Sequence, residues 1–384
     1  MEKRTIAEIN HYEGVTVNPL VSPDTLYELY SVPSFEAKYP EIIKGCQIGS
    51  SKITVEEGDV LICKINPRIN RVWVVKHHTD HELLASSEWI VVRNKSMDSN
   101  YLKWYFSSPK FRKLLTSQVA GIGGSLTRAQ PKQVSKYDVP IVCIEEQHRI
   151  ATVLDKVSDL IAKRRQQLDK LDLLVKSKFV EMFGDCKMNP KKWNICNLEE
   201  IAEVGSSKRV FVEELKETGI PFYRGTEVGA LAEGKSITPE LFITQEHYQE
   251  LCQATGVPRK GDLLMPSICP DGRIWVVNSD EPFYFKDGRV LWVHNINERF
   301  NPIFLLYTLK DRIMTDYNSI ASGTTFAELK IFSLKKCRIF DVSLELQNKF
   351  ADFVEQKEKT KASISQSLEK LETLRKALMQ EYFG

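Results

Sequence analysis

Apolar side chains recur at steps of three and four along residues 145–184, a stretch with no proline and a single glycine at its end. This spacing gives a long amphipathic helix one continuous apolar stripe, which is buried only if the helix packs against another helix. Arg164 and Lys178 occupy the two stripe positions that lack an apolar residue. The apolar positions are Ile150, Leu154, Val157, Ile161, Leu168, Leu171, Val175 and Met182.

The same pattern returns at residues 344–384 when the sequence is shifted by 200 positions, and no gap is needed. Gln147 then falls on Gln347, and Gly184 on Gly384. A repeat of so long a period decides the architecture, so we predict two copies of a domain followed by a long helix. The predicted segments are a domain at 1–144, a helix at 145–184, a domain at 185–343 and a helix at 344–384. The stripe of the second helix is Phe350, Val354, Ile364, Leu368, Leu371 and Leu378.

Charged residues interrupt the two stripes at different places. Lys357, Lys361 and Arg375 of the second helix correspond to apolar residues of the first, whereas Ile364 corresponds to Arg164. Because neither stripe is apolar throughout, one specific pairing of the two helices is favoured over open-ended self-association. The alternative is a helix that is exposed on a partly solvated face.

The two predicted domains share an order of strands, helix and loop. The β-rich runs are 58–65, 71–75 and 88–94 in the first domain and 261–268 and 273–277 in the second. A helix follows in each domain, at 101–115 and at 301–314, and then a loop, at 120–132 and at 321–329. The pattern therefore predicts an α+β fold with two mixed α/β domains.

Composition limits the class of protein only broadly. The 384 residues are 42% hydrophobic, which is enough for the cores of two or three domains. A net charge of +2 and a pI of 8.0 are weak for a free-standing nucleic-acid-binding protein. The sequence shows no secretory or transit segment and no apolar run that could span a membrane, so we expect a cytoplasmic protein. The cysteines form no C-x-x-C pair, which argues against a zinc ribbon.

Two motifs resemble parts of enzymes. Gly121-Ile122-Gly123-Gly124 is rich in glycine, but a nucleotide-binding loop lies between a strand and a helix, and this segment follows a helix. Asn301-Pro302 resembles the Asn-Pro loop of adenine methyltransferases, yet Asn and Pro also begin ordinary helices, and we favour a helix cap. The His-rich segment 77–81 is best interpreted as a polar turn. We predict no catalytic residue and no metal site.

Each domain carries a polar turn and a small-residue loop at corresponding places. Arg and Lys suit guanine edges and phosphates, Asn and Gln suit adenine edges, and small hydroxyl residues expose backbone N–H groups. A charged turn alone is weak evidence, but its duplication favours two DNA-binding surfaces. The first-domain candidates are Lys64, Asn66, Arg68, Asn70, Arg71, Ser125, Thr127, Arg128, Gln130 and Lys132. The second-domain candidates are Arg224, Arg259, Lys260, Asp271, Arg273, Thr324 and Thr325.

Eight segments carry a resemblance to a known family. They are EEQHRIATVLD at 145–155, LELQNKFADFVE at 344–355, LDKLDLLVKSKFVEMFG at 168–184, LEKLETLRKALMQEYFG at 368–384, KINPRINRVWVV at 64–75, ASSEWIV at 85–91, GIGGSLTRAQPK at 121–132 and SGTTFAELKIFSL at 322–334. In these segments, and over nearly its whole length, the chain resembles the specificity subunit of a type I restriction-modification system.

The resemblance implies that the two helices pack antiparallel as an intramolecular coiled coil and separate two target-recognition domains related by a pseudo-two-fold repeat. It implies a non-catalytic subunit whose domains each read one half of a bipartite site in double-stranded DNA. The helices would set the spacer and dock two modification subunits, and Lys357 and Lys361 would face such a partner. We expect no cofactor in this chain: S-adenosylmethionine would be bound by the modification subunits, and ATP and Mg by restriction subunits.

The turns KINPRINR and SICPDGRI differ in chemistry, so the two half-sites are expected to differ. Two other classes stay open. One is the recognition subunit of a type IIB-like enzyme. The other is a coiled-coil adaptor that binds only protein, which the near-neutral charge favours.

Overall fold

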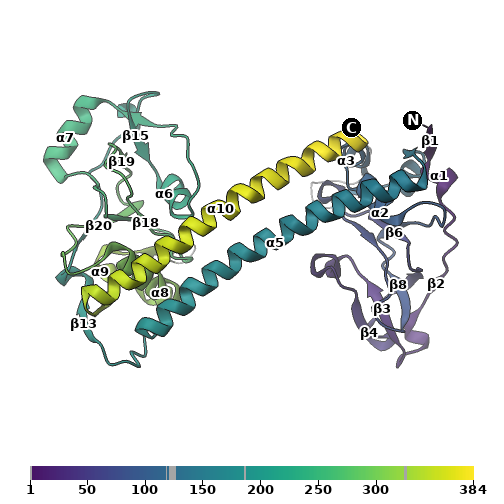
Figure 1. Ribbon diagram of the computed structural model, residues 1–384, viewed down its shortest axis with the longest axis horizontal. Coiled ribbons are helices and arrows are strands. Elements are labelled where there is room, and N and C mark those ends of the chain that lie inside the picture. Colours follow the sequence, from purple (N-terminus) through teal and green to yellow (C-terminus); the bar gives the residue numbers. More distant parts are fainter. Residues whose placement is uncertain (1, 118, 121–126, 186, 324–326) are drawn as a thin grey trace. The chain divides into compact units, whose positions relative to one another are not determined.

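The computed structural model describes residues 2–117, 119–120, 127–185, 187–323 and 327–384. The chain forms two compact units. One contains residues up to Gln166 together with Ser365–Gly384, and the other contains Gln167–Ile364. Each unit therefore holds one domain and a part of both long helices (Figure 1).

The two long helices are continuous and begin and end within a residue of the predicted bounds. Helix α5 spans Ile144–Phe183 and helix α10 spans Leu344–Phe383. Arg165 pairs with Glu372 at 2.6 Å in the first unit, and Asp172 with Lys361 at 2.8 Å in the second. Partner numbers fall along α10 as they rise along α5, which confirms the antiparallel packing.

Every predicted apolar stripe position on both helices is buried or partly buried. The predicted stripes include Phe350 but not Phe179 or Phe383, which also lie near the helix ends. The Phe383 ring lies 5.6 Å from the Tyr101 ring in the first unit, and the Phe179 ring lies 5.4 Å from the Phe350 ring in the second. The end of each long helix is thus part of a domain core.

Lys361 was expected to face a partner subunit, and this expectation was wrong. Its ammonium group contacts Asp172 of α5 at 2.8 Å and Glu358 at 3.1 Å. The lysine stem is partly buried in the helix pair, so the charge is satisfied across the helix interface. Lys357 lies over the Phe353 ring, 5.0 Å from its centroid.

The first domain is built from three sheets and a β-hairpin. Their strand orders are β2-β5-β8-β3-β4, β7-β6-β9, β1-β12 and β10-β11. The elements are β1 (Glu2–Thr5), α1 (Ile6–Ile9), β2 (Thr16–Val17), β3 (Leu26–Tyr30), β4 (Glu41–Lys44), β5 (Lys52–Thr54), β6 (Val60–Cys63), β7 (Val72–Val74), β8 (Glu82–Ala85), β9 (Trp89–Val92), α2 (Ser99–Phe106), α3 (Pro109–Ser117), β10 (Val119–Ala120), β11 (Arg128–Ala129), α4 (Pro131–Val134) and β12 (Asp138–Ile141).

Strand β6 connects two cores, because successive side chains of a strand point to opposite faces. Val60 and Ile62 pack with α2 and the long helices, whereas Leu61 and Cys63 pack with aromatic residues such as Trp73. All four strand residues are therefore buried. The turn that follows β6 starts from a rigid position.

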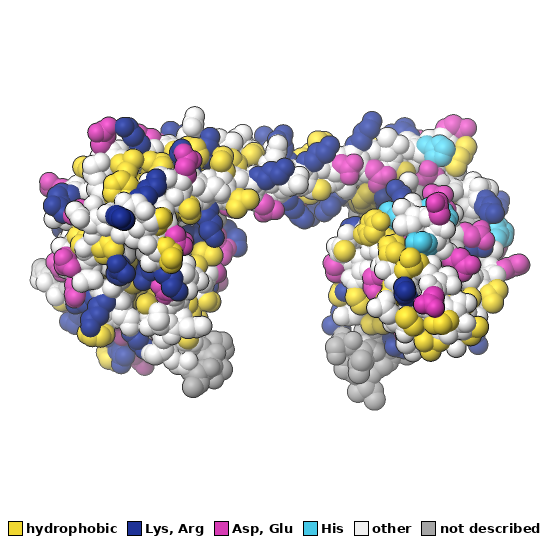
Figure 2. Space-filling view, turned by 90° about the horizontal axis from the view of Figure 1, so that it is seen from below, with side chains coloured by type: hydrophobic (Ala, Val, Ile, Leu, Met, Phe, Trp, Pro, Cys, Tyr) yellow, Lys and Arg dark blue, Asp and Glu magenta, His cyan; other side chains and the backbone are white. Residues whose placement is uncertain are grey.

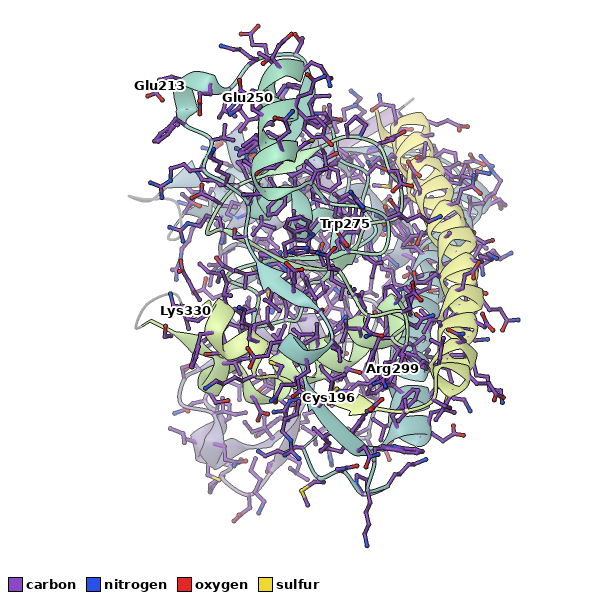
Figure 3. The ribbon with its side chains drawn as sticks, turned by 90° about the vertical axis from the view of Figure 1, so that its left-hand side faces the viewer. Cys196, Glu213, Glu250, Trp275, Arg299 and Lys330 are labelled. Atoms are coloured by element: carbon purple, nitrogen blue, oxygen red, sulfur yellow. The ribbon has the colours of Figure 1, made fainter. Side chains whose placement is uncertain are left out.

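The second domain repeats this plan. Its elements are β13 (Asn194–Asn197), β14 (Glu203–Gly205), β15 (Ile220–Tyr223), α6 (Gly225–Ala232), β16 (Phe242–Ile243), α7 (Gln245–Thr255), β17 (Leu263–Pro266), β18 (Trp275–Val276), β19 (Tyr284–Phe285), β20 (Val290–His294), α8 (Pro302–Ile320), β21 (Ala321–Ser322), β22 (Glu328–Leu329), α9 (Ile331–Lys335) and β23 (Arg338–Asp341). Strand β17 corresponds to β6 and lies in the sheet β14-β20-β17-β18. Figure 3 shows Trp275 of β18 inside this domain.

Two predicted details of local structure were tested. Asn301 caps α8, because its side-chain oxygen accepts a hydrogen bond from the Ile303 N–H at 2.9 Å, so the cap interpretation is confirmed. The segments 120–132 and 321–329 were predicted as loops, but each contributes strands to a short β-hairpin. These strands have two residues each, too few for a periodic signal.

Gln147 and Gln347 make the same contacts in the two units. The Gln147 Oε1 accepts from the Asp98 N–H at 2.9 Å, and the Gln347 Oε1 accepts from the Asn301 N–H at 2.8 Å. Asp98 and Asn301 cap α2 and α8. Each glutamine thus connects the start of a long helix to the start of the domain's own helix.

Candidate nucleic-acid interface

The polar turn and the hairpin of the first domain form one surface. The turn contains a 3-10 helix at Pro67–Ile69 and follows β6 directly. The Lys64 carbonyl accepts from the Ala129 N–H at 2.9 Å, and the Asn66 N–H donates to the Thr127 carbonyl at 3.0 Å. Two candidate segments that are distant in sequence are therefore joined by backbone hydrogen bonds.

The two asparagines of the turn determine its shape. Asn66 has φ of 50° and Asn70 has φ of 51°, in the left-handed region that asparagine tolerates better than most residues. The Asn70 side-chain amide donates to the Phe106 carbonyl at 2.9 Å, and its Oδ1 is buried. Asn70 was predicted to bind DNA, but its side chain holds the turn against α2. Arg68, at the tip, is exposed.

The other cations of this surface differ in how they are held. Arg71 lies 3.3 Å from a carboxylate oxygen of Glu36, and its side chain is largely buried. Arg128 on β11 lies 3.0 Å from Glu88 and keeps 60% of its side chain exposed. Carboxylates therefore orient both guanidinium groups.

The remaining first-domain candidates vary in access. Gln130 and Lys132 are exposed at the start of α4, and Lys64 is half-buried. Thr127 is 8% exposed, and its hydroxyl has no hydrogen-bond partner within the described part of the chain. Burial leaves Thr127 unable to reach a duplex without rearrangement. Ser125 lies outside the described residues, as does the glycine-rich segment 121–124.

The second domain reproduces the same backbone arrangement. The Ser267 N–H donates to the Arg289 carbonyl at 2.9 Å, and the Ser267 carbonyl accepts from the Leu329 N–H at 2.7 Å. Lys64 makes the equivalent bonds, as donor to the Glu88 carbonyl at 2.9 Å and as acceptor from the hairpin. Ser267 and Lys64 thus occupy equivalent places.

Two arginines of the second domain lie beside α6. Arg273 contacts Asp271 at 2.9 Å, and its Nη1 lies so near Gly229 of α6 that an added Cβ there would be 2.8 Å away. Arg224 precedes α6 and contacts Glu227 at 2.5 Å. Asp271, a predicted DNA-binding residue, is the carboxylate that pairs with Arg273.

The pKa of Glu227 reflects this pairing. Burial opposes its ionisation, but hydrogen bonds from the Arg224 side chain and backbone overcome burial and lower the pKa to about 2. Glu227 therefore carries a full negative charge at neutral pH and fixes Arg224.

Arg259 and Lys260 were grouped with this surface, and the structure separates them from it. They precede β17, whereas the turn follows β17. The Arg259 N–H donates to Asp262, and the Lys260 N–H donates to Asp280. The prediction grouped all the cations that flank one strand. Residues before and after a strand lie at its opposite ends, so they do not share one surface. Thr324 and Thr325 lie outside the described residues.

Sequence reasoning missed four charged residues at the two surfaces, which are Glu88, Arg289, Glu328 and Lys330. Glu88 pairs with Arg128 in the first domain, and Arg289 pairs with Glu328 in the second. Lys330, which Figure 3 shows at the periphery of the domain, lies 3.4 Å from Glu328. An alignment of the two halves in the register of their strands would have revealed these pairs.

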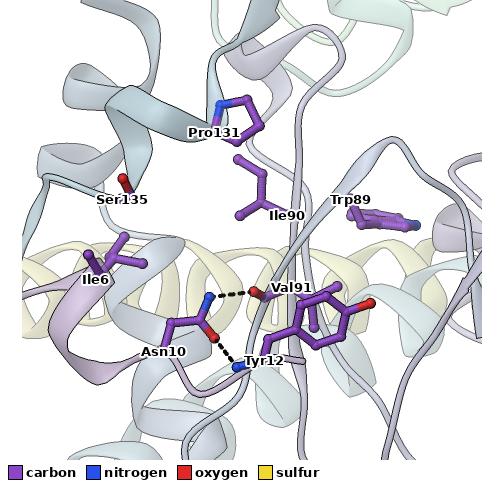
Figure 4. A pocket seen from close by; sticks show the side chains of 9 residues that line it. Ile6, Asn10, Tyr12, Trp89, Ile90, Val91, Pro131 and Ser135 are labelled. Carbon is purple, nitrogen blue, oxygen red and sulfur yellow. Dashed lines mark hydrogen bonds between the residues drawn. The ribbon is translucent and has the colours of Figure 1, made fainter. Parts of the chain in front are cut away.

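A shallow pocket lies beside the first-domain surface (Figure 4). Its lining includes Ile6, Asn10, Trp89 and Pro131. The Asn10 amide donates to the Val91 carbonyl at 2.9 Å, and its oxygen accepts from the Tyr12 N–H at 3.1 Å. The amide is thus already satisfied. Within the described residues no group of His, Cys, Asp or Glu could hold a metal ion, and no helix is long and apolar enough to cross a membrane.

The fold and the surfaces define a duplicated recognition protein, in which two similar domains each present a turn and a hairpin and share a pair of long helices. Residues 2–172 and 190–373 match the family model described as type I restriction modification DNA specificity domain. The matched residues cover most of the chain. The chain therefore belongs to this family.

Individual relatives agree with the family. The chain is 25% identical to a Haemophilus influenzae protein named as a type I restriction enzyme specificity subunit, over 73% of this chain and 69% of that protein. It is 23% identical to the type I restriction enzyme MjaVIII specificity subunit of Methanocaldococcus jannaschii, over 86% of this chain and 81% of the relative.

Solved structures support the same fold. One is a chain from a study of complex assembly and conformational transition of the type I R-M system, with a TM-score of 0.59 and 18% identity, covering 100% of this chain and 97% of that chain. The other is the type I restriction-modification S subunit from M. genitalium, with a TM-score of 0.56 and 14% identity, covering 100% of this chain and 96% of that chain.

Proposed function

We propose that this chain reads a bipartite site in double-stranded DNA for a type I restriction-modification enzyme. Each domain contacts one half-site through its turn and hairpin. The long helices set the spacer between the half-sites. Catalysis and the binding of S-adenosylmethionine, ATP and Mg belong to partner subunits.

The main support for this proposal is that the two domains share one backbone arrangement but carry different side chains on it. Lys64 and Ser267 make equivalent hydrogen bonds, but one is a cation and the other a neutral hydroxyl. Gln130 and Lys330 both precede the short helix after the hairpin, and again differ in charge. Because base edges differ in their donors and acceptors, unlike side chains on like scaffolds favour an asymmetric target.

Each long helix carries exposed leucines that we infer to contact the modification subunits. Leu173 is 64% exposed on α5, and Leu174 of α5 and Leu374 of α10 are each 45% exposed. Figure 2 shows Lys and Arg side chains among the apolar ones along the helices. Exposed leucines on an otherwise charged surface support docking of a protein partner. An adaptor that binds only protein would use the same leucines, so DNA binding is the property to test.

The test measures the affinity of the chain with its modification subunits for duplex DNA over a salt series. The duplex carries the site found by methylome sequencing. Affinity should fall steeply with salt, because phosphate contacts release counterions. Arg68→Ala should weaken binding by roughly 1 to 3 kcal/mol if Arg68 holds a base with two hydrogen bonds.

Arg259→Ala is the matched control, because Arg259 lies at the other end of the corresponding strand. It should leave affinity within about twofold of the wild type, less than the effect expected of a lost base contact. Absence of any salt-dependent binding would favour the adaptor. Unchanged affinity and unchanged salt dependence for Arg68→Ala would remove the turn from the interface.

A further inference from the structure

We propose that Arg289 is the second domain's counterpart of Arg128, so that the same cationic contact to DNA comes from a different strand in each domain. The proposal rests on the function proposed above and assigns a specificity-determining residue to it. It also identifies why the half-sites would differ at this position.

The ion pairs Glu88–Arg128 and Arg289–Glu328 occupy equivalent places with their charges exchanged. Glu88 and Arg289 stand just before β9 and β20, and their carbonyls accept the equivalent hydrogen bonds from Lys64 and Ser267. Arg128 and Glu328 begin the second strand of each hairpin, β11 and β22. In both domains the pair links the hairpin to the neighbouring sheet.

The exposure of the two arginines distinguishes a role in DNA contact from a purely structural role. The arginine side chains are 60% exposed in the first domain and 57% in the second, whereas the glutamates are 25% and 27% exposed. The arginine is thus the outward member of each pair, whichever strand carries it. A pair that only fastened the hairpin would not need its cation outside in both orientations.

The chemistry of the pair fits contact with a nucleic acid. A guanidinium has five N–H donors, and one carboxylate leaves several of them for a phosphate or a guanine edge. The glutamate fixes the orientation of the guanidinium, which lowers the entropy lost on binding. Lys330 beside Glu328 adds a second cation where the first domain has Gln130. The second domain therefore presents its charge from a different backbone position.

The test exchanges the two charges within the second domain, as Arg289→Glu together with Glu328→Arg. This double variant restores the ion pair but moves the cation to the hairpin, as in the first domain. With modification subunits present, methylome sequencing and duplex binding should show an altered second half-site and an unchanged first half-site. Glu88→Arg with Arg128→Glu is the matched control, and it should alter only the first half-site.

The melting temperature of the double variant shows whether it folds. If it does not fold, a second variant, Arg289→Ala, tests the proposal. Arg289→Ala should reduce affinity by about tenfold or more, the range expected when a base-contacting arginine is lost. If the wild type methylates a bipartite site and the double variant reads the same site with affinity within about twofold, the pair is only structural and the inference is overturned. If the wild-type complex neither binds nor methylates a bipartite site, the proposed function itself fails.

Discussion

Carboxylates lie beside most arginines of the two candidate surfaces. Arg71 has Glu36, Arg273 has Asp271, and Arg224 has both Glu227 and Glu240. The net charge is only +2 because 51 Asp and Glu nearly balance 53 Lys and Arg, and the carboxylates that pair with these arginines hold individual guanidinium groups in fixed directions. Whole-chain charge is therefore a poor guide to the local chemistry of these surfaces.

Glu227 gives a prediction about pH. Its folded pKa of about 2 lies below the value of about 4.3 for an unfolded chain, so ionised Glu227 stabilises the fold above about pH 4.3, and this contribution is lost as pH falls towards 2. Glu227→Gln should lower stability at pH 7, and its difference from the wild type should shrink between about pH 4.3 and pH 2. Urea unfolding at several pH values measures this difference.

Glu240→Gln is the control for this measurement, since Glu240 contacts the same arginine with a side chain that is 73% exposed. Its effect should be smaller, because exposed ion pairs contribute little. A Glu227→Gln deficit that stayed constant down to pH 2 would contradict the assigned cause.

At the level of residues, the sequence predicted which side chains lie in the turns better than it predicted what those side chains contact. The turn residues Arg68 and Arg71 lie where the duplicated pattern put them. The side-chain contacts of Asn70 and Asp271 were not predicted because they depend on neighbours, an α2 carbonyl in one case and Arg273 in the other. The pairing of Arg289 was missed because it joins two segments that only the fold brings together.

At the level of elements, the buried glutamines give the sharpest prediction. Gln347→Ala leaves the Asn301 N–H and the Arg299 and Val342 carbonyls without their side-chain partner. The loss should be about 1 to 3 kcal/mol, the cost of leaving a buried polar group unsatisfied. The free energy of unfolding, from urea titration, measures the loss.

Gln366→Ala on the exposed face of the same helix serves as the matched control. It should change stability by less than about 0.5 kcal/mol, as surface substitutions usually do. Because alanine favours helix more than glutamine does, helix propensity alone would not lower stability in either variant. Equal changes for the two variants would show that the three hydrogen bonds of Gln347 add nothing measurable to stability.

The long helices were predictable because a local rule, the spacing of apolar residues by three and four, acts over forty residues. The hairpins were not predictable, and neither were the sheet β2-β5-β8-β3-β4 of the first domain and the sheet β16-β15-β19 of the second. Strands such as β10 and β21 are too short for an alternating pattern, and their pairing depends on distant partners. Tertiary contacts, absent from any local window, decided these elements.

For the whole molecule, the proposed function predicts modular recognition. Exchanging residues 1–144 for the corresponding segment of another specificity subunit should change one half-site and leave the other unchanged. Methylome sequencing of cells with each chimera reads both half-sites directly. A change in both half-sites, or in neither, would contradict independent reading by the two domains.

The donor segment must also fit the helix end that it will meet. Phe383 contacts Tyr101 and Tyr105 of the first domain, so a donor with aromatic residues at these places should give a stable chimera. A donor without them should give a lower melting temperature, although its half-site would still be read independently. Stability and recognition can thus be separated within one set of chimeras.

The contact of Phe383 with the first domain also has a consequence for biosynthesis. Met379 and Phe383 belong to the same core as Val60 and Tyr101, although nearly the whole chain separates them in sequence. The first domain therefore leaves the ribosome exit tunnel early. The last residues of its core are synthesised only after the second domain. Until residue 383 leaves the exit tunnel, the oldest part of the nascent protein keeps an open apolar face, and a chaperone has that long to act on it.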